Sequence, residues 1–235
     1  MLKDSNKKNT GLRYRDIEPV VIEKISLVLL SGGVAVLPTS TIYGLSCKYG
    51  NDKAVARIYR IKNRPSEMPF IVLVPDIKTL DSLIREKTVL AEKLINRYWL
   101  SAKPDPLTIV FKKNSNFLNS RKTIPVRDSH RSEEEKVVSL VQKDEDTIAV
   151  RLDPLPVLKK ILKKTGPLIS TSANISGSGQ QAKKIEEIHE GILKKVDIIL
   201  DLQTELSGSP STIIDATAET PVILRQGALT VDFRA

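Results

Sequence analysis

The sequence predicts an α/β protein, in which one twisted mixed β-sheet is flanked by helices within a single domain. Helical patterns and short apolar runs alternate over the first half of the chain, and short apolar runs follow one another closely near its end. Alternation is typical of parallel strand pairs, whereas closely spaced strands usually pair antiparallel. A sheet of mixed direction is therefore expected. The 235 residues are enough for one domain with a substantial core.

The first helix, strand and second helix are predicted from periodicity and capping residues. A helix is expected within 17–33, where apolar residues recur at helical spacing before a glycine pair. The run "VAVLP" at 34–38 is typical of a buried strand, and its proline ends the pairing. Asp52 is expected to cap a second helix over 53–62.

The rest of the chain continues this pattern. A strand rich in β-branched residues is predicted at 70–75, and helical patterns follow it as far as Trp99. Further strands are predicted at 107–111, 147–152, 167–170, 197–201, 211–215 and 222–225. Further helices are predicted at 155–166 and 184–195.

Two polar stretches divide the chain into a tail and one domain. Residues 1–12 form a polar N-terminal tail, and the domain is expected to cover 13–235. A polar insertion at about 113–146 has almost no apolar periodicity, which indicates a long surface loop that could cover a site.

Composition restricts the classes of partner and compartment. The chain carries 37 Lys and Arg against 28 Asp and Glu, a surplus of +9 that suits either polyanionic partners or solvated lysine-rich helix faces. Its single cysteine, Cys47, excludes an internal disulfide and leaves no set of ligands for structural zinc. We see no signal peptide and no membrane span, so a cytoplasmic location without a membrane partner is expected.

Several familiar catalytic signatures are missing. The sequence has no phosphate loop of the G-x-x-x-x-G-K-[ST] type, no G-x-G-x-x-G and no H-E-x-x-H. The two histidines, His130 and His189, lie in polar or charged surroundings away from the hydroxyl-rich segments. A Ser-His-Asp hydrolase is not expected, because the general base has no obvious carrier.

Polar side chains instead cluster after the apolar runs. The segment "STSANISG" at 170–177 places hydroxyls and an amide at a predicted strand end, either as a local turn or as a ligand site. Lys62 and Arg64 end a helix, where a simple charge pair with the helix dipole also explains them. Similar polar groups follow the other runs: Thr39, Ser40, Thr41, Tyr43, Thr108, Ser211 and Arg225.

Taken in order, these motifs resemble a known family. The order P-T-x-T-x-Y-G-L, K-x-R-P, P-L-T, S-T-S-A-N-x-S-G, P-S-T-x-x-D and I-L-R-x-G resembles the YrdC family of threonylcarbamoyl-AMP synthases. The resemblance runs from about Ile17 to Ala228, and the chain looks like the short, single-domain form. It implies a YrdC-like fold.

The resemblance also implies a reaction. Members of this family are nucleotidyltransferases that condense L-threonine, bicarbonate and ATP into threonylcarbamoyl-adenylate and release pyrophosphate. A partner transferase complex then modifies an adenosine of tRNA. Mg²⁺ would accompany ATP, held by phosphates and water, with no tightly bound cofactor and no protein metal ligands. The fold's basic face makes tRNA or double-stranded RNA a possible partner.

Site residues follow from the matched motif positions. The catalytic set corresponds to Lys62, Arg64, Ser172 and Asn174. The threonine-binding set corresponds to Thr41, Thr108, Ser170 and Ser211. The ATP-binding set corresponds to Arg64, Met68, Pro104, Ser172 and Arg225.

The chain departs from the family pattern at five positions. Ser40 replaces the acidic residue usual between the two threonines of the first motif, and Met68 replaces a polar residue after K-x-R-P. Leu73 stands where some members have histidine, Asp105 replaces glycine before P-L-T, and Gln180 replaces a serine. These departures leave two alternatives open, a catalytically diverged paralogue and a non-catalytic RNA-binding module. RNA-backbone binding needs scattered Lys and Arg but no S-T-S-A-N strand end.

Overall fold

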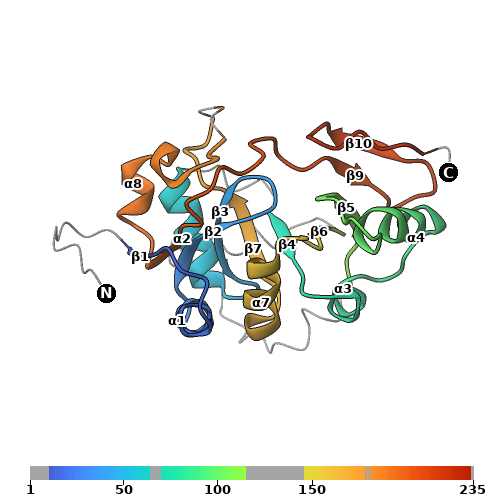
Figure 1. Cartoon of the computed structure of the whole chain (residues 1–235). Coiled ribbons are helices and arrows are strands. Elements are labelled where there is room, and N and C mark those ends of the chain that lie inside the picture. The colour runs from blue at the N-terminus through green and yellow to red at the C-terminus, as the bar shows by residue number, and fades with distance from the viewer. Residues whose placement is uncertain (1–10, 64–69, 115–145, 178, 180, 234–235) are drawn as a thin grey trace, which may run out of the picture.

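The computed structural model describes residues 11–63, 70–114, 146–177, 179 and 181–233. Ten strands of this part of the chain form one mixed sheet, in the order β1-β8-β2-β3-β7-β4-β6-β5-β9-β10 (Figure 1). The strands are β1 (Leu12–Tyr14), β2 (Val34–Pro38), β3 (Tyr43–Lys48), β4 (Ile71–Leu73), β5 (Thr108–Lys112), β6 (Thr147–Arg151), β7 (Leu168–Ser172), β8 (Ile198–Leu200), β9 (Ile213–Asp215) and β10 (Val222–Arg225). The predicted mixed sheet with flanking helices is confirmed.

Helices cover the sheet on both faces. They are α1 (Pro19–Leu30), α2 (Asp52–Lys62), α3 (Ile77–Leu83), α4 (Val89–Leu94), α7 (Pro156–Thr165) and α8 (Glu190–Leu193), with a π-helical turn η1 (Ile95–Trp99) and a 3₁₀ turn η3 (Ile185–Glu187). Helices α1 and α7 lie side by side below the sheet, with α2 and α8 towards its β1 end and α3 and α4 near β5 (Figure 1).

Strand β2 shows why the middle of the sheet is apolar throughout. Val34 and Val36 pack in the core on the α2 side, whereas Ala35 and Leu37 pack against α1 and α7. Side chains alternate between the faces of a strand, so a strand covered on both faces needs apolar residues at every position. The middle strands are thereby held between two apolar layers, which gives the strand ends a fixed base.

Helix α2 begins one residue earlier than predicted and has a different cap. The side chain of Asn51, and not that of Asp52, accepts a hydrogen bond, from the Ala54 backbone N–H at 3.1 Å. Asp52 is instead the first helical residue, where its carboxylate interacts favourably with the positive end of the helix dipole. The helix ends at Lys62, and the left-handed backbone of the capping residue Asn63 (φ 49°) turns the chain there.

Three further elements differ from the sequence-based expectations. Strand β1, at the start of the expected domain, was not predicted; it pairs in parallel with β8. Strand β3 was not predicted; it pairs antiparallel with β2 and with β7. The single helix expected over 184–195 is two short turns, η3 and α8, separated by the extended Ile188.

The predicted insertion lies mainly outside the described residues, which stop at Asn114 and resume at Asp146. Strands β5 and β6 on either side of it pair antiparallel, from Ile109 with Val150 to Lys112 with Thr147. Within the described residues, no helix is long and apolar enough to cross a membrane.

Candidate functional site

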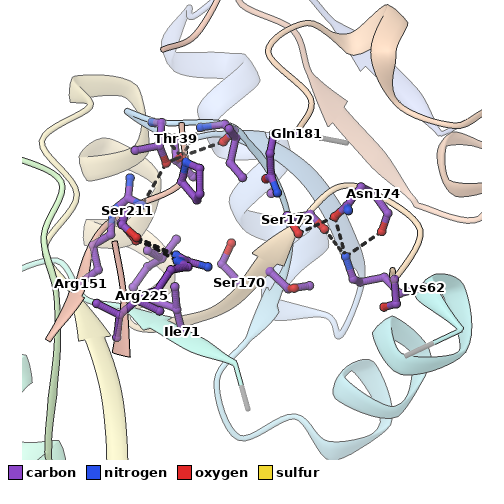
Figure 2. Close-up of a pocket in the computed structure, with 18 of the residues that line it drawn as sticks. Thr39, Lys62, Ile71, Arg151, Ser170, Ser172, Asn174, Gln181, Ser211 and Arg225 are labelled. Atoms are coloured by element: carbon purple, nitrogen blue, oxygen red, sulfur yellow. Dashed lines mark hydrogen bonds between the residues drawn. The ribbon is translucent and has the colours of Figure 1, made fainter. Parts of the chain in front are cut away.

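A cavity of about 460 Å³ opens where the end of β7 meets the β2–β3 turn and the segment before β9. Figure 2 shows two groups of polar side chains around it, with Ser170 between them. One group contains Thr39, Arg151 and Arg225, and the other contains Lys62 and Asn174. The two groups come from motifs far apart in the sequence, so the fold assembles the site.

The β2–β3 turn supplies two hydroxyls of the first group. Thr39 Oγ1 accepts hydrogen bonds from the backbone N–H groups of Thr41 and Ile42, both at 3.2 Å, and donates to the Ile42 carbonyl at 2.7 Å. The hydroxyls of Thr39 and Thr41 are 2.9 Å apart. The P-T-x-T motif therefore closes the turn on itself and fixes Thr41 at the cavity wall.

Gly44 makes room for the next hydroxyl. A Cβ atom at Gly44 would lie 2.6 Å from Ser170 Oγ. Two residues further along β3, Ser46 Oγ donates to Ser170 Oγ on β7 at 3.1 Å. The glycine of the Y-G-L motif thus allows Ser170 to occupy the middle of the cavity wall.

Lys62 organises the second group. Its Nζ donates to the carbonyl oxygens of Ser172 and Asn174, the latter at 2.7 Å, and to Asn174 Oδ1 at 3.2 Å. Ser172 Oγ also donates to Asn174 Oδ1 at 2.5 Å. These contacts join the K-x-R and S-x-N motifs directly, and they hold the strand end in a defined shape beside a buried ammonium group.

Arg225 reaches the cavity from the last strand. Its guanidinium donates to the Ser211 carbonyl oxygen from Nε at 3.0 Å and from Nη2 at 2.9 Å. Ser211 Oγ lies 2.8 Å from Thr108 Oγ1. Thr108 is fully buried and is not among the described residues that line the cavity, so it supports Ser211 from behind.

Two residues of the site were not found from the sequence. Arg151, at the end of β6, lines the cavity and donates to Thr41 Oγ1 at 3.0 Å and to Ser40 Oγ at 2.8 Å. Asp153 forms an ion pair with Arg151 and accepts from Ser40 Oγ at 3.0 Å. The available signal was an arginine that ends an apolar strand and is followed within two residues by an aspartate.

The charge balance of the cavity favours anions. Burial, and next the nearby positive charge of Arg151, lower the pKa of Arg225, although an arginine stays protonated at neutral pH. No carboxylate among the described residues forms an ion pair with Arg225, whereas Arg151 has Asp153. Arg225 is an exposed residue whose guanidinium lines the cavity, so its charge is accessible to an anionic ligand, for which guanidinium N–H groups are strong donors.

Buried polar atoms indicate a polar ligand. Within the described part of the chain, Arg151 Nε, Ser176 Oγ and Gln181 Oε1 are buried without a hydrogen-bond partner. All three residues line the cavity. Each unsatisfied buried group costs about 1–3 kcal/mol, a cost that a polar ligand or water reaching these side chains would offset.

Most of the predicted site residues come together here. Those that line the cavity are Thr41, Lys62, Ser170, Ser172, Asn174, Ser211 and Arg225. Leu73 also lines it. Pro104 is not among the described lining residues, whereas Arg64, Met68 and Gln180 lie outside the described part of the chain.

Fold and site together define an α/β protein whose strand ends surround a hydroxyl-lined cavity with two arginines and one lysine in its wall. The Sua5/YciO/YrdC family model, described as "Telomere recombination", matches residues 27–227. The chain belongs to this family.

Relatives with assigned names support this placement. A "Threonylcarbamoyl-AMP synthase" of Pyrococcus abyssi is 30% identical over 202 residues, covering 86% of this chain and 52% of the relative. One from Vibrio vulnificus is 28% identical over 207 residues, covering 88% and 98%. The "Uncharacterized protein YciO" of Escherichia coli is 29% identical over 201 residues, covering 85% of each.

Solved structures show the same fold. P. abyssi Sua5 complexed with L-threonine matches with a TM-score of 0.73 and 29% identity, over 95% of this chain and 58% of that one. E. coli YciO matches with a TM-score of 0.71 and 26% identity, over 94% and 96%. The chain spans about half the length of the P. abyssi and Bacillus subtilis curated relatives, 52% and 54%.

Proposed function

We propose that this protein is a threonylcarbamoyl-AMP synthase, a nucleotidyltransferase that condenses L-threonine, bicarbonate and ATP. The threonine amine takes up bicarbonate with loss of water and becomes a carbamate. A carbamate oxygen then forms a bond to the α-phosphorus of ATP, and the bond to the leaving pyrophosphate breaks. The products are threonylcarbamoyl-adenylate and pyrophosphate.

This chemistry needs positioning and charge stabilisation more than it needs a nucleophilic side chain. The substrates supply both the attacking oxygen and the leaving group. The lining of the cavity, hydroxyls with two guanidinium groups and one ammonium, suits that task. The names of the P. abyssi and V. vulnificus relatives support the same reaction.

The observation that carries the proposal is the meeting of the two polar groups around a single cavity. The Thr41, Ser170 and Arg151 side offers hydroxyls and a guanidinium, a set that matches the hydroxyl and carboxylate of L-threonine. The Lys62 and Asn174 side offers positive charge and polar groups at a strand end, which suit phosphates. One cavity could therefore hold both reactants within reach of each other.

Arg225 lies in the same polar group as Arg151, and we propose that its guanidinium contacts the nucleotide phosphates where the two ligands meet. Its guanidinium already bonds to Ser211 and carries no ion pair with a described carboxylate, so its charge remains for an anionic ligand. Phosphates are strong acceptors for guanidinium N–H groups. Thr108 would act through Ser211 instead of touching the substrate.

Mg²⁺ is proposed to enter with ATP, coordinated by phosphate oxygens and water. The described residues contain no group of three His, Cys, Asp or Glu side chains that could hold a metal ion. Binding through the nucleotide requires no such group. The ion would neutralise phosphate charge as pyrophosphate leaves.

The adenylate would be consumed outside this cavity. We propose that a transferase complex passes the threonylcarbamoyl group to tRNA in the cytoplasm. The surplus of +9 charges is compatible with tRNA or double-stranded RNA as a direct partner, and an RNA-binding assay at several salt concentrations tests that point.

Pyrophosphate release tests the proposed reaction. We expect release only when ATP, L-threonine and bicarbonate are all present. Arg225→Ala should reduce the rate about a hundredfold, because it removes a charge placed for the phosphates. Arg97→Ala is the control, since Arg97 pairs with Asp232 and is not among the described lining residues; it should keep the rate of the unmodified protein.

The outcomes separate the alternatives. Release without threonine would identify an ATPase and overturn the synthase. No release from folded protein that still binds ATP would favour a catalytically diverged paralogue. No release together with tight RNA binding would favour a non-catalytic RNA module.

A further inference from the structure

The most deeply buried carboxylate next to the cavity belongs to Asp153, which has no exposed surface. Its Oδ1 accepts hydrogen bonds from the backbone N–H groups of Ser40 at 3.1 Å and Leu155 at 3.0 Å. Its Oδ2 accepts from Ser40 Oγ and from the Arg151 guanidinium. An ionised carboxylate is an acceptor only, so these four donors occupy both of its oxygens.

Asp153 therefore acts through its neighbours instead of contacting the substrate. It is not among the described residues that line the cavity, whereas Arg151 is. Arg151 also donates to Ser40 Oγ and to Thr41 Oγ1, so the carboxylate, the guanidinium and the β2–β3 turn form one hydrogen-bonded unit. Movement of Asp153 would move both Arg151 and Thr41.

Ser40 has a carboxylate beside it, although its own side chain is uncharged. The family resemblance implies an acidic residue between the two threonines of the first motif, and this chain has serine there. The carboxylate of Asp153, which follows β6, lies 3.0 Å from the Ser40 hydroxyl. A negative charge is thus present at this turn, but it comes from a different segment of the chain.

We propose that Asp153 is the positioning residue of the amino-acid side of the cavity, and that it supplies the carboxylate which residue 40 lacks. It holds the Arg151 guanidinium in the orientation that receives the carboxylate of L-threonine, and it fixes Thr41 beside it. This inference rests on the proposed function, because it assigns L-threonine to the Arg151 side of the cavity.

The shape of the unit explains why the charge of Asp153 matters. Asparagine at this position would keep the size of the side chain but would place an NH₂ donor or a neutral oxygen against the Arg151 guanidinium. Breaking a buried ion pair leaves the remaining charge uncompensated, so Arg151 would turn towards another acceptor. Its loss from the cavity wall would affect the amino acid and leave the nucleotide side unchanged.

The test measures binding of L-threonine and of ATP separately, by calorimetry, on the full-length chain. Asp153→Asn should weaken L-threonine binding on the order of tenfold, the effect of losing one hydrogen bond to a charged group. ATP affinity should stay within about twofold. The exchange Ser40→Asp with Asp153→Ser should recover L-threonine binding, because it returns a carboxylate to the same guanidinium.

Two further variants separate positioning from folding. Asp201→Asn removes another buried carboxylate that is paired with an arginine, Arg13, away from the cavity. It should lower the melting temperature without changing L-threonine affinity. If Asp153→Asn does not fold, Asp153→Glu provides the second test, because it keeps the charge but moves the carboxylate that accepts directly from Arg151; it should weaken L-threonine binding and leave ATP affinity unchanged.

Each outcome decides the proposal. Equal L-threonine affinity in Asp153→Asn and the unmodified protein, or parallel losses of L-threonine and ATP affinity, would overturn it. A folded exchange variant that stays weak for L-threonine would overturn the claim that the two positions supply one carboxylate. If the unmodified protein binds no L-threonine and releases no pyrophosphate, the proposed function falls and this inference falls with it.

Discussion

At the scale of single residues, Lys62 shows how a charge can serve both the fold and the chemistry. It is 1% exposed, yet its ammonium lies at the cavity wall and bonds to the strand end at Ser172 and Asn174. A direct bond to phosphate would have to replace one of these contacts. In the structure as it stands, Lys62 contributes its charge through space and fixes the shape of the S-x-N segment.

Gly44 allows a residue-scale prediction. Gly44→Ala would place a Cβ 2.6 Å from Ser170 Oγ and 3.3 Å from the Thr171 carbonyl oxygen, so Ser170 must move. We expect kcat/KM for L-threonine to fall by roughly ten- to a hundredfold, as displacements below 1 Å do in preorganised sites. Stability should decrease by about 1–3 kcal/mol, the usual cost of overpacking.

Steady-state kinetics and urea unfolding check this prediction. Gly191→Ala is the control, because a Cβ there meets only the His189 side chain, at 3.0 Å. Unchanged kinetics in Gly44→Ala, or an equal loss in Gly191→Ala, would show that Ser170 does not need its present position.

At the scale of elements, the glycine of the I-L-R-x-G motif joins two segments of the site. A Cβ at Gly227 would lie 2.1 Å from the Pro210 carbonyl oxygen and 2.5 Å from Thr212 N. The Gly227 N–H donates to Thr212 Oγ1 at 3.0 Å. This close approach of the two backbone segments allows Arg225 to bond to Ser211. The glycine of the motif is therefore needed to place the arginine.

Gly227→Ala should therefore separate the β10 end from the segment before β9. Since the contacting atoms belong to the backbone, we expect a loss of about 1–3 kcal/mol in the free energy of unfolding. Pyrophosphate release should fall at least about tenfold as Arg225 leaves Ser211. Gln226→Ala, in the same segment but exposed, should retain both properties. Equal behaviour of the two variants would contradict the account.

The sequence predicted most elements and failed where local patterns and tertiary contacts disagree. Strands such as β2 and β7 were found because each is a short apolar run preceded by glycine and bounded by proline. Strand β3, "YGLSCK", was missed because glycine, serine and lysine interrupt its pattern, although neighbours on both sides bury it. The helix predicted over 184–195 breaks at Ile188. The next residue, His189, is the N-cap of α8 and accepts a hydrogen bond from the Gly191 N–H.

The site was predicted to a similar extent. Motifs with small hydroxyls and amides pointed to one cavity, and seven of the predicted residues line it. Arg151 and Asp153 were not found because their roles depend on contact with Ser40, which lies more than a hundred residues earlier and becomes adjacent only through the sheet. The local signal, an arginine at a strand end followed by an aspartate, does not reveal the contact with Ser40.

At the scale of the whole molecule, two partly buried carboxylates with lowered pKa values link the stability to pH. Burial alone would raise the pKa of Asp197, but hydrogen bonds from the Arg57 guanidinium and the Val34 N–H outweigh burial and lower it. Burial would also raise the pKa of Asp201, but the hydrogen bond from the Gln203 N–H and the contact with Arg13 outweigh burial and lower it. Asp197 joins α2 to the strands β2 and β8, and Asp201 joins β1 to the end of β8.

Both groups should make the protein less stable in acid. A carboxyl whose pKa is lower in the folded state contributes stability that is fully present above its unfolded pKa, about 4, and is lost as pH falls below it. We expect the free energy of unfolding in urea to decrease between about pH 5 and pH 3. Asp197→Asn should show a shallower decrease, and a slope equal to that of the unmodified protein would contradict the assignment.

The central claim is that one cavity binds L-threonine and the nucleotide side by side. The most direct test is a crystal structure with L-threonine and α,β-methylene-ATP, whose bridging carbon prevents pyrophosphate from leaving. The account predicts the amino-acid carboxylate on Arg151 and the phosphates beside Lys62, Ser172 and Arg225. Both ligands bound outside this cavity, or an empty cavity at saturating concentrations of both, would contradict it.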